Sequence, residues 1–118
     1  MKYHVCREED VPAGQMRTYT VKNFPVVVVH SKKGEFYAIY GICPHQRSLL
    51  GQGVLGGLTE AGAPGEEFRY TREGEILRCA WHGFDYDVTT GTCLTNPEKL
   101  RVKTYPVTVD KQEVYVDV

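Results

Sequence analysis

The sequence shows no excess of charge of either sign, no long apolar run and no secretory signal, and each absence excludes a class of protein. Its 118 residues contain 14 Lys and Arg against 15 Asp and Glu, so the strongly basic surface of most nucleic-acid-binding proteins is missing. No apolar run approaches the roughly 18 residues of a transmembrane helix, and the N-terminal segment lacks the apolar core of a signal peptide. We therefore expect a cytoplasmic protein that binds neither nucleic acid nor membranes.

Cysteine is also scarce, and the sequence signatures of several common sites are absent. Four Cys in 118 residues are too few for a disulfide-stabilised scaffold, and a reducing compartment would keep them as thiols or metal ligands. There is no G-x-G-x-x-G after a strand, no P-loop and no H-E-x-x-H motif. Nothing indicates a flavin or nicotinamide site, or the ligand triad of a mononuclear iron. The four Cys and four His therefore remain as the residues that can carry chemistry.

Valine, by contrast, is abundant, with 15 copies against 7 Leu and 5 Ala, and it is accompanied by eight Tyr. These residues favour pleated, half-buried surfaces, and the short runs between Gly, Pro and Asp predict one all-β domain over residues 1–118. The continuous apolar run 24–30 predicts a central strand that is buried on both faces. Further strands are predicted at residues 3–6, 16–21, 35–40, 76–79, 105–109 and 113–118.

The middle of the chain has a different character. Residues 41–57 contain five Gly, residues 58–67 are polar and loop-like, and residues 70–75 predict a tight turn that leads into the strand 76–79. Irregular backbone held in a rigid β scaffold is where functional sites tend to lie. The sequence therefore directs attention to this central segment.

Two short motifs lie in that segment, Cys43-Pro44-His45 and Cys79-Ala80-Trp81-His82. Thiolate is a soft donor and neutral imidazole a borderline one, so two of each suit either Zn²⁺ or an iron–sulfur cluster. Structural zinc sites usually pair Cys with Cys and His with His at short spacing, whereas here each motif mixes the two. The residue types leave both metals open, and the arrangement favours the cluster.

The motifs CPH at 43–45 and CAWHGF at 79–84 resemble those of the Rieske [2Fe–2S] domain. The flanking stretches, VPAGQMRTYTV at 11–21, FDYDVTTGTCL at 84–94 and YPVTVDKQEVYV at 105–116, agree, so the resemblance covers nearly the whole chain. It implies an antiparallel β-sandwich or barrel with an inserted cluster-binding subdomain. It also implies cluster-binding loops at about 41–50 and 78–86.

The same resemblance implies a ligand set. Two Cys hold one iron of a Rieske centre and two His hold the other. Carried over to this chain, Cys43 and Cys79 bind the inner iron, and His45 and His82 bind the outer iron nearer solvent. One such cluster per chain is expected.

One departure from the family lies between the two motifs. Thirty-three residues separate His45 from Cys79, about twice the spacing in many members. The excess corresponds to an extended loop at about 57–74, which is polar and rich in Gly, Pro and Glu. A surface loop or a short hairpin accommodates it, since loop length adds little closure entropy. Partner selection and simple tolerance of an insertion are both open as its role.

A second departure bears on the reduction potential. Respiratory Rieske proteins place an extra Cys in each loop and join the two by a disulfide, but the matching positions here are Ser48 and Trp81. Phe84 stands where their cluster accepts a hydrogen bond from Ser, although Tyr86 could supply a hydroxyl instead. Because hydrogen bonds to the sulfurs raise the potential, we expect the low part of the range of roughly −150 to +300 mV. A potential in the low part of the range matches the ferredoxins and oxygenase domains of aromatic-ring dioxygenase systems.

The remaining Cys, His and acidic residues have simpler interpretations. Cys6 and Cys93 are expected to be small buried residues. His4 and His30 have no partner motif and are expected to be strand or surface residues. The pair Asp85 and Asp87 is expected to be solvated, and Asn96-Pro97 is either a third loop that shields the cluster or an ordinary turn.

The resemblance also implies a function: a one-electron carrier that performs no catalysis alone. It would accept electrons from a flavin-containing NAD(P)H reductase and pass them to a ring-hydroxylating oxygenase, as a monomer or weak oligomer. The expected docking patch consists of Pro44, His45, Gln46, Trp81, His82 and Phe84. Three alternatives stay open: the small subunit of an assimilatory nitrite reductase, a zinc-stabilised binding module without redox activity, and a free-standing oxidative enzyme.

Overall fold

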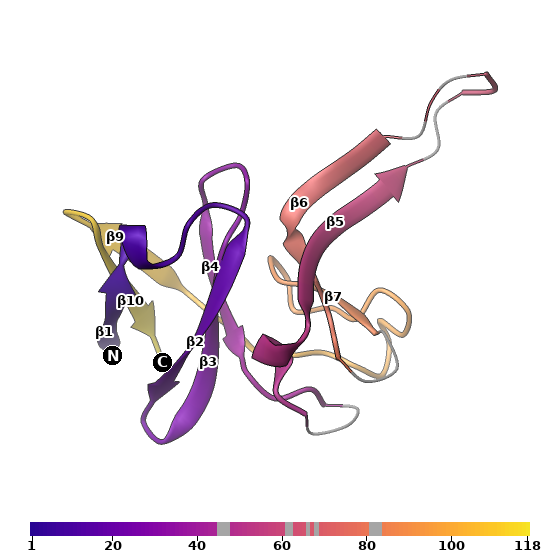
Figure 1. Cartoon of the computed structure of the whole chain (residues 1–118). Helices are drawn as coiled ribbons and strands as arrows, with labels where there is room; N and C mark the ends of the chain where they lie inside the picture. Colours follow the sequence, from indigo (N-terminus) through magenta and orange to yellow (C-terminus); the bar gives the residue numbers. More distant parts are fainter. Residues whose placement is uncertain (45–47, 61–62, 66, 68, 81–83) are drawn as a thin grey trace.

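The computed structural model describes residues 1–44, 48–60, 63–65, 67, 69–80 and 84–118. Strands dominate it and are arranged in three antiparallel sheets (Figure 1). The first sheet has the order β1-β10-β9, the second β2-β3-β4-β8 and the third β5-β6-β7. Two single 3-10 turns are present in the described part of the chain, η1 (Glu8–Asp10) and η2 (Leu50–Gln52). The strands are β1 (Lys2–Arg7), β2 (Gln15–Val21), β3 (Phe24–His30), β4 (Phe36–Tyr40), β5 (Val54–Glu60), β6 (Arg69–Arg78), β7 (Asp85–Asp87), β8 (Thr104–Tyr105), β9 (Val107–Asp110) and β10 (Glu113–Asp117).

This arrangement confirms the predicted all-β, antiparallel fold with an inserted subdomain. Strands β4 and β8 pair directly, with Ala38 opposite Tyr105 and Ile39 opposite Thr104. The whole β5-β6-β7 sheet therefore leaves and rejoins the frame between two neighbouring strands. No helix in the described residues is long and apolar enough to cross a membrane.

Strand β3 separates two buried clusters, one on each face of the central sheet. Val27 and Val29 belong to the first cluster, which also contains Cys43. Val26 and Val28 belong to the second cluster, together with side chains from β1 and β10. None of these four Val has any exposed surface. Because successive side chains of a strand point to opposite faces, an uninterrupted apolar run is what a strand between two cores requires, as predicted.

The predicted strand 105–109 is wrong as a single element. Tyr105 ends β8 in the central sheet, and Val107 begins β9 in the first sheet. Pro106 stands between them and has no backbone N–H to donate to a ladder. The proline therefore marks the point at which the chain changes sheets.

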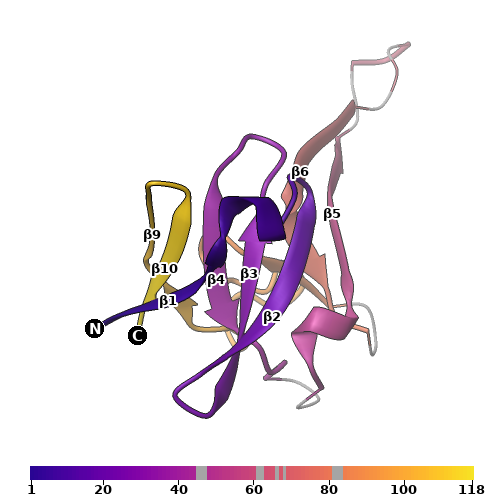
Figure 2. The same cartoon turned by 60° about the vertical axis from the view of Figure 1, so that its left-hand side comes forward.

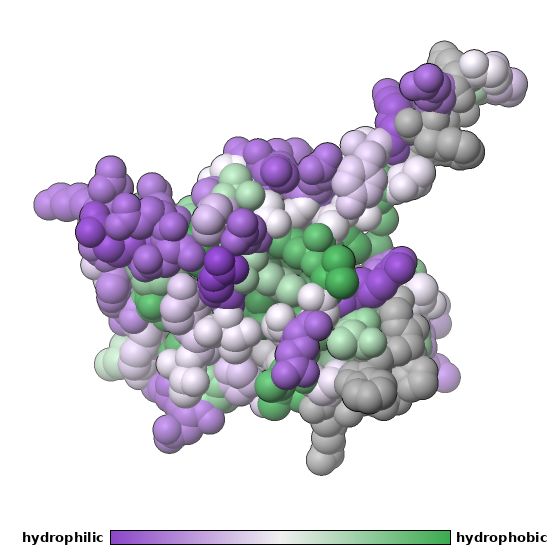
Figure 3. Space-filling view, viewed as in Figure 1, coloured by the Kyte–Doolittle hydropathy of each residue, from purple (hydrophilic) through white to green (hydrophobic). Residues whose placement is uncertain are grey.

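The predicted loop at 57–74 is largely a β-hairpin, so the hairpin alternative is the correct one. Strands β5 and β6 pair from Val54 opposite Arg78 to Glu60 opposite Arg69. The outer part of the hairpin stands away from the other two sheets in both views (Figures 1 and 2). Its outer end and the β1-β10-β9 sheet are hydrophilic, whereas apolar side chains gather near its base (Figure 3).

The predicted tight turn at 70–75 is likewise wrong, because these residues lie inside β6. The register shifts between Gly56 and Leu58, and opposite this point the backbone of Arg72 has φ +56° and that of Gly74 φ +81°. Gly74 also packs tightly, since an added Cβ would lie 2.8 Å from the Cα of Ser31. The turn-like composition thus produces a bulge that bends the strand.

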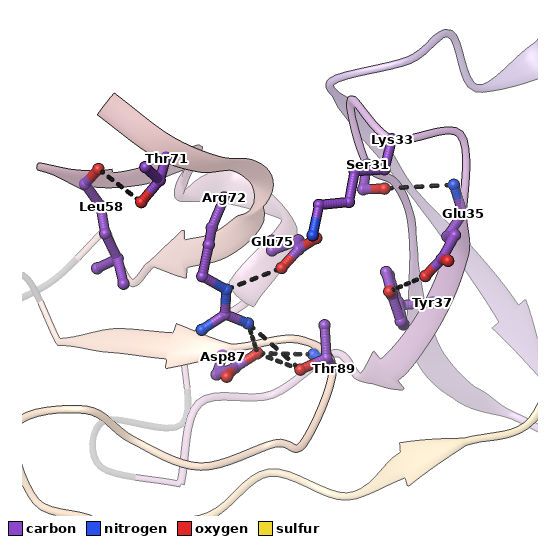
Figure 4. A network of polar contacts seen from close by, with 10 residues as sticks. All are labelled: Ser31, Lys33, Glu35, Tyr37, Leu58, Thr71, Arg72, Glu75, Asp87 and Thr89. Atoms are coloured by element: carbon purple, nitrogen blue, oxygen red, sulfur yellow. Dashed lines mark hydrogen bonds and ion pairs between the residues drawn. The ribbon is translucent and has the colours of Figure 1, made fainter. Parts of the chain in front are cut away.

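A buried ionic network fixes this bend (Figure 4). The Arg72 guanidinium donates to Glu75 and to Asp87, at 2.8 Å in each case. Lys33, in the β3–β4 turn, lies 3.6 Å from Glu75. Glu75 and Asp87 are almost completely buried. The expectation of a solvated Asp87 is therefore wrong. The sequence did not indicate its burial, because its partner Arg72 lies 15 positions away.

Candidate metal centre

Cys43 and Cys79 open two loops that are built alike. The backbone N–H of Cys43 donates to the carbonyl of Ser48, and that of Cys79 donates to the carbonyl of Phe84, at 2.8 Å in both cases. Each cysteine is thus bonded to the residue five positions later. These two bonds close the predicted cluster-binding loops.

Both cysteine side chains are buried, with 0% of Cys43 and 2% of Cys79 exposed. They belong to the same apolar cluster, which also contains Leu50, Leu77 and Tyr86. Two thiols from segments far apart in the sequence are therefore brought into one dry region. Such surroundings suit a redox centre, since the apolar shell controls solvent access and the local dielectric.

Two hydroxyl groups contact the cysteine sulfurs. Each sulfur is contacted by a hydroxyl from the segment that carries the other cysteine. The Ser48 hydroxyl, on the loop that Cys43 opens, lies 3.3 Å from Cys79 Sγ. The Tyr86 hydroxyl, on β7 after the second loop, lies 3.4 Å from Cys43 Sγ. These crossed contacts hold the two loops side by side. The sequence comparison allowed for Tyr86 but missed Ser48, because 31 positions separate Ser48 from the cysteine that it touches.

Tyr86 is a neutral hydrogen-bond donor at physiological pH. Its side chain has no exposed surface. Burial raises the pKa of Tyr86 far above its usual value, and the hydrogen bond with Cys43 raises it further. The phenol therefore stays protonated and can donate a hydrogen bond to a thiolate.

The two predicted histidine ligands, His45 and His82, lie outside the described residues, as does Trp81. Within the part of the chain that the structure describes, no three His, Cys, Asp or Glu side chains gather to hold a metal. The four-residue ligand set therefore stays a prediction, of which the structure places the two cysteines. Those two fit a cluster: they are buried, they share one apolar region, and each has a hydroxyl beside its sulfur.

The other cysteines and histidines lie where the sequence predicts. Cys6 and Cys93 are buried in different clusters. His4 pairs with Glu113 on the surface. The Nδ1 atom of His30 lies 2.7 Å from the carbonyl oxygen of Val11. Cys93 packs in the same cluster as Cys43 and Cys79, whereas Cys6 lies in the other cluster.

A third segment packs against the two loops. The N–H of Leu94 donates to the carbonyl of Asp85, and Cys93 forms an isolated bridge with Tyr86. The N–H of Leu100 donates to the carbonyl of Asn96, so the predicted turn at Asn96-Pro97 is confirmed as a turn. Its role as a shield for the cluster stays a prediction.

Comparisons with known proteins agree with this geometry. The family model described as "Rieske [2Fe-2S] domain" matches residues 1–106. The ferredoxin component of the p-cumate 2,3-dioxygenase system of Pseudomonas putida is 26% identical over 115 residues, which cover 97% of this chain and 83% of that protein.

Two solved structures have the same fold. One is a complex of reduced oxygenase and oxidized ferredoxin in carbazole 1,9a-dioxygenase, whose matching chain has a TM-score of 0.72 and 26% identity over 98% of this chain and 91% of its own. The other is a putative small subunit of an NADPH nitrite reductase, with a TM-score of 0.77 and 18% identity over 100% of this chain and 99% of its own. At that identity the second likeness concerns the fold alone.

Proposed function

This chain belongs to the Rieske [2Fe–2S] domain family, and we propose on that premise that it carries single electrons from a reductase to an oxygenase. It has no catalytic activity of its own in this role. The observation that carries the proposal is the pair of buried cysteines on two neighbouring loops, each with a hydroxyl group beside its sulfur. The dioxygenase-system relative, which matches over nearly the whole chain, supports it.

Four residues would hold the cluster. Cys43 and Cys79 would bind the inner iron as thiolates, and His45 and His82 would bind the outer iron through neutral imidazole nitrogens. When bound, the cluster supplies a one-electron redox couple. The chain's own groups set its conditions: Tyr86 and Ser48 donate hydroxyl hydrogens to the two sulfurs, and the surrounding apolar side chains exclude water.

The surface near the two loops is suited to brief contacts. Among the described members of the proposed docking patch, Pro44 is exposed and Phe84 half-buried. Leu49 and Leu94 lie beside the same loops and are 44% and 39% exposed. Small apolar surfaces of this kind are typical of weak, transient electron-transfer interfaces. The partners that we propose are a flavin-containing NAD(P)H reductase and a terminal oxygenase.

Metal analysis and spectroscopy of the 118-residue chain test this function. We expect a brown protein with two iron and two sulfide per chain and, after reduction with dithionite, a Rieske-type electron paramagnetic resonance signal. Cys43→Ser and Cys79→Ser should lose the cluster, whereas Cys6→Ser should keep it. A colourless protein with one bound zinc would instead identify a structural module.

A subunit of nitrite reductase is the second candidate, since a putative protein of that kind shares the fold. The two candidates differ in whether the chain works while diffusing freely. Electron delivery from a reductase to a separate aromatic-ring oxygenase, with the chain added at catalytic amounts, supports the carrier. Stable co-purification with a nitrite-reducing flavoprotein would support the subunit.

A further inference from the structure

An open groove with a volume of about 440 Å³ lies beside the loop of Cys43. Tyr40, Ile42, Cys43 and Pro44 form one wall of the groove, and residues 101–103 form the other. All of the lining residues are described by the structure. The groove therefore gives a partner an approach close to the inner-iron cysteine, at a place outside the proposed docking patch except for Pro44.

Positive charge is concentrated on the second wall. Arg101 and Lys103 on this wall are exposed, and so is Lys99, which precedes the wall in the sequence and does not line the groove. The alternating residues Leu100 and Val102 pack against the apolar cluster that contains Cys43. Among the described residues, none of the three cations has a carboxylate partner within 4.0 Å, whereas several other cations of the chain do. The wall thus presents uncompensated charge on a molecule whose net charge is −1.

The cations stand on a rigid frame. Arg101 forms an isolated bridge with Thr92, and its guanidinium donates to the carbonyl of Thr90 at 3.2 Å. The N–H of Tyr40 donates to the carbonyl of Lys103 at 2.8 Å, which ties the two walls together. The ammonium of Lys103 lies 5.5 Å from the ring centroid of Tyr105. Preorganised charges of this kind lose little side-chain entropy when they bind.

A second hollow of about 340 Å³ extends the groove, because Tyr40 and Lys103 line both. It adds a further cation, Lys22, and two aromatic rings, those of Phe24 and Tyr105. The Phe24 ring centroid lies 5.9 Å from that of Tyr40 and 6.1 Å from that of Tyr105. Among the residues that the structure describes, no Asp or Glu side chain lines either hollow. The surface therefore combines aromatic area with positive charge.

We infer that this basic groove docks the acidic face of a redox partner protein, an inference that rests on the proposed function. Carboxylates of the partner pair with Arg101 and Lys103, and an apolar side chain of the partner packs on Tyr40 and Pro44. One electron then passes between the two proteins, one centre being oxidised and the other reduced, with no bond made or broken. The charges mainly steer encounter, since exposed cations raise association rates more than affinity.

Small charged oxidants test the steering directly. The dithionite-reduced, cluster-loaded protein is mixed with ferricyanide, which takes one electron to become ferrocyanide, and separately with the cation tris(phenanthroline)cobalt(III). At about 0.01 M ionic strength, where the screening length is about 30 Å, Arg101→Gln/Lys103→Gln should slow oxidation by ferricyanide roughly three- to tenfold. Oxidation by the cobalt complex should not slow. At about 1 M salt, where the screening length is about 3 Å, the difference should disappear.

A control variant removes the same charge elsewhere. Lys32 and Lys111 are exposed in the β3–β4 and β9–β10 turns, away from the Cys43 loop (Figure 1). Lys32→Gln/Lys111→Gln should leave the ferricyanide rate within about twofold of the wild-type rate. Equal slowing in the two double variants, or no slowing in the groove variant, would overturn the inference.

Peptide binding gives a readout that needs no electron transfer. Decaglutamate should bind the wild-type chain in isothermal titration calorimetry, should bind the groove variant at least fivefold more weakly, and should bind the control variant as it binds wild type. Unchanged binding to the groove variant would show that acidic segments dock elsewhere. If the wild-type protein takes up no cluster, the proposed function fails, and the peptide measurement still decides whether the groove recognises acidic chains.

Discussion

At the scale of single residues, the site depends on two hydroxyl groups that the local motifs do not contain. The motifs themselves are readable because each cysteine lies within three positions of its predicted histidine. The contact of Ser48 with Cys79 is not readable, since it crosses between loops 31 positions apart. The same reason hides the pairing of Arg72 with Asp87. Local chemistry could be predicted from this sequence, whereas partners brought together by the fold could not.

The two hydroxyls should raise the reduction potential of the bound cluster. Tyr86→Phe and Ser48→Ala each remove one donor to a cysteine sulfur. A hydrogen bond that stabilises the reduced state by about 1 kcal/mol raises the potential of a one-electron couple by roughly 40 mV. The reduction potential of each variant should therefore be lower than that of the wild type by about this amount. A redox titration followed by electron paramagnetic resonance measures the shift. Tyr37→Phe, which changes a tyrosine bonded to Glu35 instead, is the matched control.

Tyr37 also predicts a loss of stability in alkaline solution. Burial raises the pKa of Tyr37 from 10.0 to about 12, and the hydrogen bond to Glu35 adds to the shift. Between these two values the folded chain keeps a proton that the unfolded chain releases, so the free energy of unfolding falls as pH rises from 10 to 12. Urea unfolding followed by fluorescence at several alkaline pH values should show a shallower fall for Tyr37→Phe.

At the scale of elements, the patterns of the frame are more informative than those of the insertion. The run of Val in β3 predicted its two buried faces, because a strand between two cores leaves no alternation to read. The sequence around Gly74 predicts a turn where the structure has a bend in β6, because a glycine at positive φ occurs both in turns and in β-bulges. The division of the predicted strand 105–109 at Pro106 was also not predictable, because it arises from β8 and β9 joining different sheets.

The ionic network at that bend should contribute strongly to stability. Arg72→Met leaves the buried carboxylates of Glu75 and Asp87 without their main partner, and Lys33 remains 3.6 Å from Glu75. Removing one partner of a buried pair is destabilising by about 3 kcal/mol. Arg78→Met, which breaks a pair whose arginine is 62% exposed, should change stability much less, because exposed ion pairs are screened by solvent. Urea unfolding of both variants compares them, and similar losses would contradict a buried network.

At the scale of the whole molecule, the chain is an elongated body of 49 × 32 × 21 Å with the hairpin β5–β6 as a projecting arm (Figure 2). The arm has two parts. Its base carries Arg72, which bonds to Asp87 of β7, and Glu75, which lies 3.6 Å from Lys33 in the frame. Its outer part carries Thr59 and Tyr70, which are exposed. Few buried groups therefore depend on the outer part. The outer part can therefore be removed on its own, which makes it possible to test whether the insertion selects a partner or is merely tolerated.

Shortening the arm tests that division. Leu58 and Thr71 pair across the hairpin, so replacing residues 59–70 by Asn-Gly gives a two-residue turn of a favoured type while keeping Arg72 and Glu75. Because every described side chain that this cut removes is exposed, the free energy of unfolding should change by less than about 1 kcal/mol and the cluster content should be unchanged. A deeper cut that also removes Arg72 should destabilise the chain as Arg72→Met does. If the shorter chain folds and binds the cluster but exchanges electrons more slowly with only one of the two proposed partners, the arm selects that partner. Unchanged rates with both would identify a tolerated insertion.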